Sequence, residues 1–449
     1  MAERIVKMMS KKGNVRLVYT VLIILSYILA VTLIFWGIYS IMQGEQALGD
    51  KKNIGGGQAS IPVLSVTDKG QTLLVGQESI RAVWIATVSN INYPSQRDMS
   101  EQQLSSELDN IVENAARLGA NTIFFQVRPC SDALYNSSIF PQSHYVSGRR
   151  GEAADGGFDS LAYLISAAHS KGISVHAWVN PVRVLSGSKQ DPATADELCE
   201  DEPAALHPEW TVQYADGKLY FNLGIPEVRT LISDGVYEIV KNYDVDGVVF
   251  DDYFYPYPVY DEGGDMAVFD DSDAYAKYGG TMSLDDFRRD CVNTLVRVCK
   301  IAVKKANKNC LFGIAPFGIW KNSVSEGGAG TAGLEAYYEI YCDALSFARE
   351  GNVDYVAPQL YWGIGDESAD FIRLADWWNT VLSGTDTVLI PCLAAYRYTE
   401  GSYSKGELTA QIEYARKLTG YAGCAVYGYA ALTDNSLSVS GELAALWGE

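Results

Sequence analysis

From residue 80 onward the chain repeats one pattern: a short apolar run, a loop, and a segment with helical spacing. The apolar runs begin at Arg81, Asn121, Ile173, Asp246, Cys310, Asp354, Thr387 and Gly423. Runs that are apolar throughout are typical of strands buried on both faces, and strands that alternate with helices form a parallel sheet. Eight such units predict an α/β fold, a (β/α)8 TIM barrel over residues 80–449. A doubly wound open sheet is the alternative, but no Gly-x-Gly-x-x-Gly motif follows the first run.

The segments between the runs carry helix signals. Residues 100–119 begin with Ser-x-x-Gln, the pattern of a capping box, and end at a glycine. Residues 158–172 and 405–420 also end at glycine. Residues 283–308 place acids at their start and bases at their end, as the helix dipole favours. A last helix is expected over 438–449.

The N-terminus has a different character. Residues 1–16 carry five basic side chains and one acidic one, and residues 17–42 carry no charge. As a helix, residues 17–42 would be about 39 Å long, enough to cross a hydrocarbon core of about 30 Å with tilt. The pattern predicts a cytoplasmic tail, a single-pass membrane anchor and an extracellular barrel, with a long cleavable signal as the alternative. Residues 43–79 are expected to be a linker, with a hairpin around Asp68, Lys69 and Gly70.

Charge and cysteine usage narrow the function classes. The formal net charge is −20, and because the first 16 residues contribute +4, the rest carries −24. A body this acidic does not neutralise phosphates, so we expect no nucleic-acid partner. The eight cysteines show no Cys-x-x-Cys or Cys/His metal spacing, and we expect most to be buried as small hydrophobic side chains. No cofactor or metal is predicted, and a monomer is expected.

Polar and aromatic residues gather where nearly every predicted strand ends. Active sites of this barrel form at the carboxyl ends of the strands. Aromatic faces with a few convergent polar groups suit sugar rings, so these residues are candidates for substrate binding. The candidates are Gln126, Arg128, His176, Trp178, Asn180, Arg183, Tyr253, Tyr255, Trp320, Asn322, Gln359, Tyr361, Trp362, Tyr396 and Tyr427.

Two adjacent acids, Asp251 and Asp252, close the fourth run in "DGVVFDDYFYPYP". Glycoside hydrolysis needs one carboxyl group as proton donor and a second as nucleophile or base. Adjacent strand residues point to opposite faces, so both face the axis only if one turns as the strand ends. Two close carboxylates would raise the pKa of one, which favours an acid role. An acid that only caps the strand or orients Arg128 or Arg183 is the alternative. Other candidates for the second carboxyl are Asp366, Glu367, Asp370, Glu400 and Asp434.

Five motifs in order, "VWIATVSNINYPS", "NTIFFQVRPCSDALYNSSIFPQS", "VHAWVNPVRV", "DGVVFDDYFYP" and "FGIAPFGIWKN", resemble the bacterial family 10 glycosyl hydrolase-like barrel proteins. These proteins are distinct from the xylanases that share the number. The resemblance covers about residues 80–430. It implies a TIM-barrel glycosidase outside the cytoplasm that acts on envelope glycans such as peptidoglycan. It also implies Asp251 and Asp252 as the catalytic pair, in a cleft lined by Arg128, Asn180, Arg183, Trp320, Asn322 and Gln359.

Two other functions fit parts of the sequence. A non-catalytic glycan-binding barrel would keep the aromatic lining and would not depend on the two acids. A metal-dependent polysaccharide deacetylase would use an Asp-Asp pair, but it needs histidines at close spacing. The chain has four histidines, and His169 and His176 straddle a helix–strand junction.

Overall fold

The computed structural model describes residues 64–66, 72–74, 79–260, 263–434 and 436–448. The predicted membrane anchor, residues 17–42, lies outside them. Among the helices in the described part of the chain, none combines the length and apolar character needed to cross a bilayer. Two short strands, β1 (Leu64–Val66) and β2 (Thr72–Leu74), pair antiparallel where the sequence suggests a hairpin.

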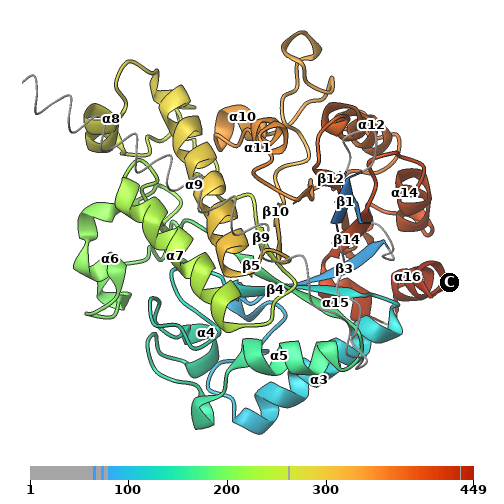
Figure 1. Cartoon of the computed structure of the whole chain (residues 1–449), viewed down its shortest axis with the longest axis horizontal. Helices are drawn as coiled ribbons and strands as arrows, with labels where there is room; N and C mark the ends of the chain where they lie inside the picture. Colours follow the sequence, from blue (N-terminus) through green and yellow to red (C-terminus); the bar gives the residue numbers. More distant parts are fainter. Residues whose placement is uncertain (1–63, 67–71, 75–78, 261–262, 435, 449) are drawn as a thin grey trace, which may run out of the picture. The chain divides into compact units, whose positions relative to one another are not determined.

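A nine-stranded sheet forms the centre of the molecule (Figure 1). Its strands run in the order β12-β11-β10-β9-β5-β4-β3-β14-β13, and all neighbours are parallel. They are β3 (Ile80–Ile85), β4 (Thr122–Arg128), β5 (Ser174–Val179), β9 (Gly247–Phe250), β10 (Leu311–Ile314), β11 (Tyr355–Val356), β12 (Val388–Leu389), β13 (Cys392–Ala394) and β14 (Gly423–Tyr427). Each of the eight apolar runs contributes to this sheet.

The two end strands of the sheet come from one segment, the run that begins at Thr387. Within it, Leu389 N donates to Gly420 O at 2.9 Å, before β14, and Ile390 N donates to Val356 O of β11 at 2.9 Å. The segment therefore bonds toward both ends of the strand order, and the sheet curls in the manner of a TIM barrel.

Helices cover the outer face of the sheet. The main ones are α3 (Glu101–Arg117), α5 (Ser160–His169), α7 (Pro226–Asn242), α9 (Leu284–Ala306), α12 (Phe371–Leu382), α14 (Glu407–Ala415) and α16 (Val439–Trp447). At the start of α3, the Ser100 side chain accepts from Gln103 N and the Gln103 side chain accepts from Ser100 N. This is the predicted capping box.

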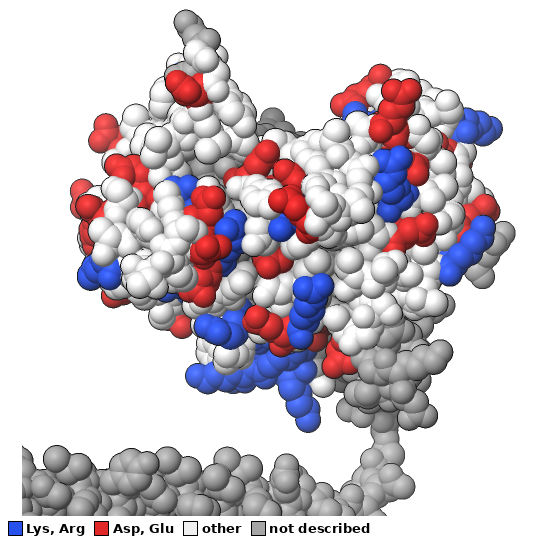
Figure 2. All heavy atoms as spheres, turned by 90° about the horizontal axis from the view of Figure 1, so that it is seen from above, with Lys and Arg blue, Asp and Glu red and all other residues white. Residues whose placement is uncertain are grey.

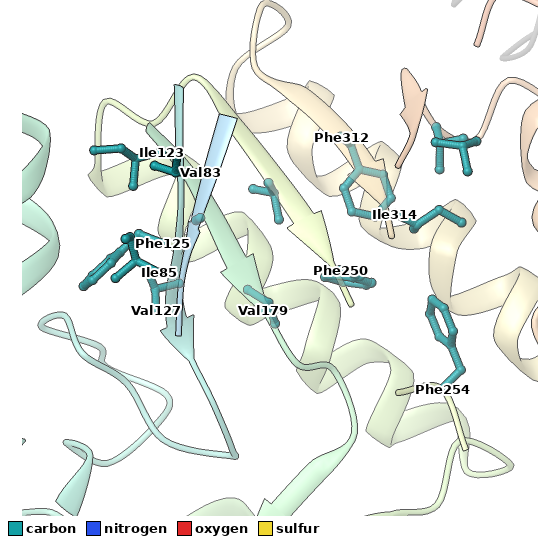
Figure 3. Packing of buried hydrophobic residues seen from close by; sticks show 14 of the residues in the cluster. Val83, Ile85, Ile123, Phe125, Val127, Val179, Phe250, Phe254, Phe312 and Ile314 are labelled. Carbon is teal, nitrogen blue, oxygen red and sulfur yellow. The ribbon is translucent and has the colours of Figure 1, made fainter. Parts of the chain in front are cut away.

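Alternate residues of each strand pack into different layers. In β4, Ile123, Phe125 and Val127 face the helices (Figure 3), whereas Phe124 belongs to an inner cluster with Trp84 and Trp178. Both faces are thus buried, which explains why the runs read as continuously apolar. The eight cysteines are free thiols and only Cys199 is partly exposed, as expected for small hydrophobic side chains.

Two long loops follow β5 and β9. The first carries a three-stranded antiparallel sheet in the order β6-β8-β7, formed by β6 (Arg183–Leu185), β7 (Thr211–Gln213) and β8 (Leu219–Phe221). The second begins with the two adjacent acids and continues to α8 (Ser272–Tyr278). Both loops leave the carboxyl ends of their strands, where sites form in this architecture.

Candidate active site

Asp251 follows the last residue of β9 and is 5% exposed. Its Oδ2 accepts from Trp178 Nε1 and from Asn180 Nδ2, each at 3.0 Å. Trp178 lies in β5, beside β9, and points to the inner layer of the sheet. The side chain of Asp251 therefore continues the inner face of β9, in line with strand alternation.

Asp252 is equally buried but has different partners. Its Oδ1 accepts from Gln359 Nε2 at 2.9 Å, and its Oδ2 accepts from the hydroxyl of Tyr257. Gln359 also donates to Ala315 O at 3.0 Å, so it joins the segments that follow β10 and β11. Because β9 has already ended at Phe250, Asp252 is free of strand geometry. The turn brings its charge close enough to raise the pKa of Asp251.

The environment of the pair favours the protonated form of at least one acid. Burial, and next the negative charge of Asp252, raise the pKa of Asp251 to about 7. Burial also raises the pKa of Asp252, against the donors of Tyr257 and Gln359, which stabilise its anion. A carboxylic acid that titrates near neutrality can serve as a proton donor.

One arginine and two tyrosines complete the immediate surroundings. The Arg183 guanidinium lies 4.6 Å from the centre of the Tyr253 ring, and its charge lowers the pKa of Asp251. The Tyr253 and Tyr257 rings stack at 4.9 Å with an angle of 11°. Arg183 N also donates to Asn180 Oδ1 at 2.9 Å. Tyr257 belongs to the motif "DGVVFDDYFYPYP" but is not among the residues predicted from the sequence. The two prolines of the motif obscure the period of that segment.

Three further predicted tyrosines lie near the acids. Tyr361 and Tyr427 stack with centres 6.1 Å apart, and Tyr396 meets both edge-on. Burial and then the charges of Tyr396, Asp252 and Asp251 raise the pKa of Tyr427. These rings give the site an aromatic side, as the sequence suggests.

Arg128 does not join this group. The pairing of β4 with β5 shifts between Gln126 and Arg128, a bulge-type irregularity that changes which way the side chain points. The guanidinium of Arg128 lies 3.6 Å from the centre of the Phe140 ring and against Gly235 of α7. The structure therefore places Arg128 under the helices and not in a cleft.

His176 is also remote from the acids. It pairs with Gly247, at the start of β9, so it lies deeper in the barrel than Trp178. Its Nδ1 is 2.8 Å from the Tyr355 hydroxyl, and burial lowers its pKa to about 4. His176 is a neutral residue of the inner core.

The other predicted residues have structural contacts of their own. Gln126 Oε1 accepts from Thr87 N and Val88 N, both at 2.9 Å. Tyr255 packs between Phe269 and Tyr341. Trp320 donates to Asp343, Asn322 donates to Gly333 O, and Trp362 packs beside Gly318. These contacts do not bring the five to the acids.

The alternative second carboxyls are engaged elsewhere. Asp366 accepts from Ser368 and Ala369, and Asp370 caps α12. Glu400 pairs with Arg397 at 3.1 Å, and the exposed Asp434 accepts from Ser436. Glu367 is exposed. The geometry thus favours Asp251 and Asp252 as the two carboxyls.

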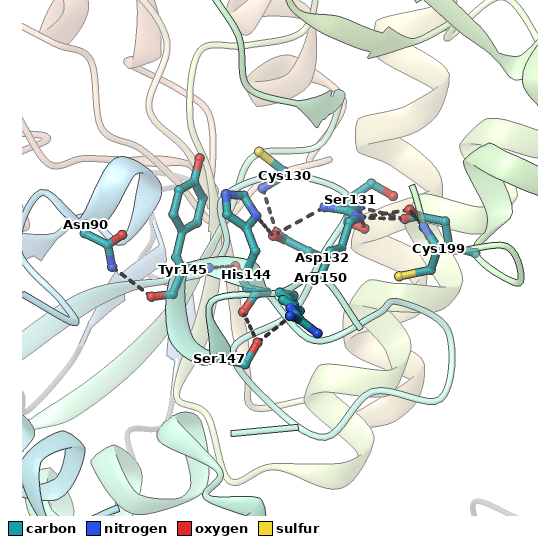
Figure 4. Close-up of polar contacts among 12 residues, drawn as sticks. Asn90, Cys130, Ser131, Asp132, His144, Tyr145, Ser147, Arg150 and Cys199 are labelled. Carbon is teal, nitrogen blue, oxygen red and sulfur yellow. Dashed lines mark hydrogen bonds and ion pairs between the residues drawn. The ribbon is translucent and has the colours of Figure 1, made fainter. Parts of the chain in front are cut away.

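A buried polar network fixes the loop after β4 (Figure 4). Oδ1 of Asp132 accepts from Cys130 N at 3.1 Å, and its Oδ2 lies 3.5 Å from Arg150 Nη1 and 3.9 Å from His144 Nδ1. Arg150 also forms a bidentate pair with Glu202. Ser131 N donates to Val184 O at 3.4 Å, so the network supports β6, which begins at Arg183. Within the described residues, no three His, Cys, Asp or Glu side chains form a group that could hold a metal ion.

The fold is that of a glycosidase-type barrel, and comparisons with known proteins agree. Residues 79–407 match the model of the family described as glycosyl hydrolase-like 10, and the chain belongs to this family. It is 36% identical over 372 residues to glycosyl hydrolase YngK of Bacillus subtilis, covering 81% of this chain and 71% of the relative. It is 35% identical over 344 residues to glycosyl hydrolase DigH of Escherichia coli, covering 72% and 75%.

Solved structures support the same fold. The endo-1,4-beta-mannanase of Rhizomucor miehei superposes with a TM-score of 0.52 at 12% identity, covering 85% of this chain and 99% of that one. At this identity the likeness concerns the fold alone.

Proposed function

We propose that the protein is a glycoside hydrolase in which Asp251 donates the proton and Asp252 acts as the anionic partner. The observation that carries the proposal is the pair itself. Two adjacent buried carboxyls follow β9, and separate sets of donors on neighbouring strands hold them. Purely structural acids rarely stand side by side in a buried setting, because each opposes the ionisation of the other.

The proposed roles follow from the partners. Asp251, with its pKa near 7, holds a proton in a large fraction of molecules at neutral pH and gives it to the glycosidic oxygen as the C–O bond breaks. Tyr257 and Gln359 donate to Asp252 and favour its anion. Asp252 supplies negative charge at the anomeric carbon, directly or through the attacking water. Trp178 and Asn180 hold Asp251 in place by hydrogen bonds, and Arg183 and Trp178 lower its pKa against the effect of burial.

We further propose an envelope glycan as substrate, with peptidoglycan strands as the leading candidate. Two observations support this substrate. The motifs resemble those of the family 10 glycosyl hydrolase-like proteins, and Tyr361, Tyr396 and Tyr427 form an aromatic side of the site. The hydrogen bonds of the segment after Thr387 support a closed (β/α)8 barrel around the site. The uncharged residues 17–42 and the basic tail support a membrane-anchored monomer with the barrel outside the cell.

The test is incubation of the purified full-length chain with peptidoglycan glycan strands, followed by mass analysis of the products and an assay for new reducing ends. We expect cleavage that falls by at least about 10³-fold in Asp251→Asn and in Asp252→Asn. Glycan affinity without new reducing ends would instead indicate a binding barrel. Cleavage unchanged in both variants would remove these acids from the mechanism.

A further inference from the structure

A groove lies between the loop that follows β5 and the loop that follows β9, which begins with the two acids. It has a volume of about 590 Å³, and its walls come from the segment around Trp210 in the loop after β5 and from α8 in the loop after β9. Figure 1 shows α8 and α6 (Pro203–Leu206) along one side of the molecule, away from the centre of the sheet. No residue of this groove belongs to the candidate active site.

Aromatic rings form one wall of the groove. The rings of His207 and Trp210 stack with centres 4.0 Å apart and an angle of 11°. Tyr278, at the end of α8, also lines the groove. Flat rings of this kind pack against the C–H faces of sugars, and Trp and Tyr retain a polar edge for hydroxyl groups.

One amide donor in the lining of the groove has no partner in the described part of the chain. Asn222 is 5% exposed, its N donates to Trp210 O at 2.8 Å, and its Oδ1 accepts from Gly224 N at 2.9 Å. The hydrogen bond from Gly224 N shows which atom of the Asn222 amide is the oxygen. The other atom, the nitrogen Nδ2, can therefore donate a hydrogen bond in the groove that Asn222 lines. Within the described part of the chain, this nitrogen donates to no other residue. The nitrogen is not sealed from solvent, so it is available to donate to a ligand oxygen.

The charges of the groove restrict the ligand. Its lining includes the carboxylates of Glu209, Glu227, Asp270 and Asp273, against a single lysine, Lys277. Figure 2 shows acidic side chains over much of the face in view, whereas Lys and Arg form one cluster near its lower edge and stand singly elsewhere. Carboxylates accept hydrogen bonds from hydroxyl and amine groups but repel anions. The groove therefore suits sugars without acidic groups.

The groove is connected to the candidate site through one strand pair. Asn222 directly follows β8, and Tyr220 of β8 pairs with Arg183, the first residue of β6. The groove and Arg183 therefore share the loop that follows β5.

We propose that this groove is a second glycan-binding site, which holds the neutral N-acetylglucosamine units of an envelope glycan at a distance from the bond that is cleaved. This proposal rests on the proposed glycan substrate. It assigns Trp210 and His207 as the ring wall and Asn222 as the donor to a sugar oxygen.

The test measures binding to the full-length chain carrying Asp252→Asn, so that no sugar is consumed. The probe is the uncharged tetrasaccharide of β-1,4-linked N-acetylglucosamine, and titration calorimetry gives stoichiometry and affinity. We expect two sites per chain, and loss of one of them, at least about tenfold in affinity, with Trp210→Ala or with Asn222→Asp. Asn222→Asp keeps an acceptor for Gly224 N, removes the donor and adds a negative charge, whereas Trp210→Ala leaves the charge of the groove unchanged. The matched control is Tyr163→Ala, which removes an aromatic ring of α5 whose hydroxyl donates to Asp109 of α3. This variant should leave both binding sites intact.

The outcomes separate this proposal from the proposed function. One site that disappears with Asn222→Asp would support the groove and count against glycan binding at the acids. If neither Trp210→Ala nor Asn222→Asp changes the number of binding sites or their affinities, the groove proposal is overturned. Equal binding of tetragalacturonate in the groove would also overturn it, because that chain carries a carboxylate on every unit.

Discussion

The indole nitrogen of Trp178 lies 3.0 Å from Oδ2 of Asp251 and donates a hydrogen bond to it. This contact joins the inner layer of the barrel to the first residue after β9. A neutral donor holds the carboxyl in place without the full stabilisation that a cation would give to its charge. The pKa of Asp251 consequently stays near 7, within the range that a proton donor needs at neutral pH.

The pH dependence of cleavage should reflect this acid. If Asp251 donates the proton, kcat/KM falls as the pH rises above about 7, because the proton is lost. The Arg183 cation lowers the pKa of Asp251, so Arg183→Met should raise that pKa and move the alkaline limb upward by about one pH unit. A pH profile of kcat/KM for both proteins measures the shift. An alkaline limb that stays in place or moves downward would contradict the role of Asp251.

The same acid makes the folded protein sensitive to pH. The folded pKa of Asp251 lies above its ordinary value of 3.8, so the folded state binds the proton more tightly than the unfolded state. This contribution to stability is present below about pH 4 and is lost as the pH rises through about 7. Asp251→Asn removes the ionisation and should therefore stabilise the protein at pH 8 by about 2–4 kcal/mol.

Thermal unfolding of wild type and Asp251→Asn at pH 4 and pH 8 checks this sign. The two proteins should have similar Tm values at pH 4, and the variant should unfold several degrees higher at pH 8. Asp434→Asn is a suitable control because Asp434 is exposed and its pKa is lowered by Ser436. A variant that is less stable than wild type at pH 8 would show that the ionised carboxyl is well solvated or fully paired.

Two tyrosines of one motif should respond differently to loss of their hydroxyl group. The Tyr257 hydroxyl donates to Asp252, whereas the buried Tyr255 hydroxyl has no hydrogen-bond partner among the described residues. Tyr257→Phe keeps the ring that stacks on Tyr253 but removes the donor, so the pKa of Asp252 should rise and kcat should fall by about tenfold or more. Tyr255→Phe should leave kcat unchanged. Steady-state kinetics and the acid limb of the pH profile distinguish them, and equal effects would contradict the assignment.

Much of the fold could be predicted because its determinants are local. Each apolar run holds a strand since alternate residues fill an inner and an outer layer, and a capping box marks the start of α3. The position of Asp251 and Asp252 was predictable for the same reason, because a strand end in a parallel sheet fixes where the next residues lie.

For some residues, the distance from Asp251 and Asp252 depends on features that the sequence pattern does not contain. A shift of pairing turns Arg128 toward the helices, and depth along the barrel separates His176 from Trp178 although they are only two residues apart. Tyr257 was missed because a proline-interrupted loop has no regular period. Of the two donors to Asp252, Gln359 comes from a segment more than a hundred residues away, and no local pattern links it to the acid.

Arg128 and Arg183 test whether a predicted residue must lie beside Asp251 and Asp252 to contribute to activity. Arg128 lies under the helices, whereas Arg183 lies beside the acids. Arg128 is fully buried, its Nε and Nη1 have no hydrogen-bond partners in the part of the chain that the structure describes, and burial lowers its pKa. A buried cation with such incomplete pairing gains little from its charge, so an apolar side chain of similar length should be tolerated. Arg128→Met should keep kcat/KM within about twofold and leave the free energy of unfolding within about 1 kcal/mol or raise it. Arg183→Met, in contrast, should lower kcat/KM by about 10²-fold or more, because Arg183 lies beside the acids. Kinetics and denaturant unfolding of the two variants provide the comparison, and a loss of activity in Arg128→Met without a loss of stability would return Arg128 to the substrate-binding set.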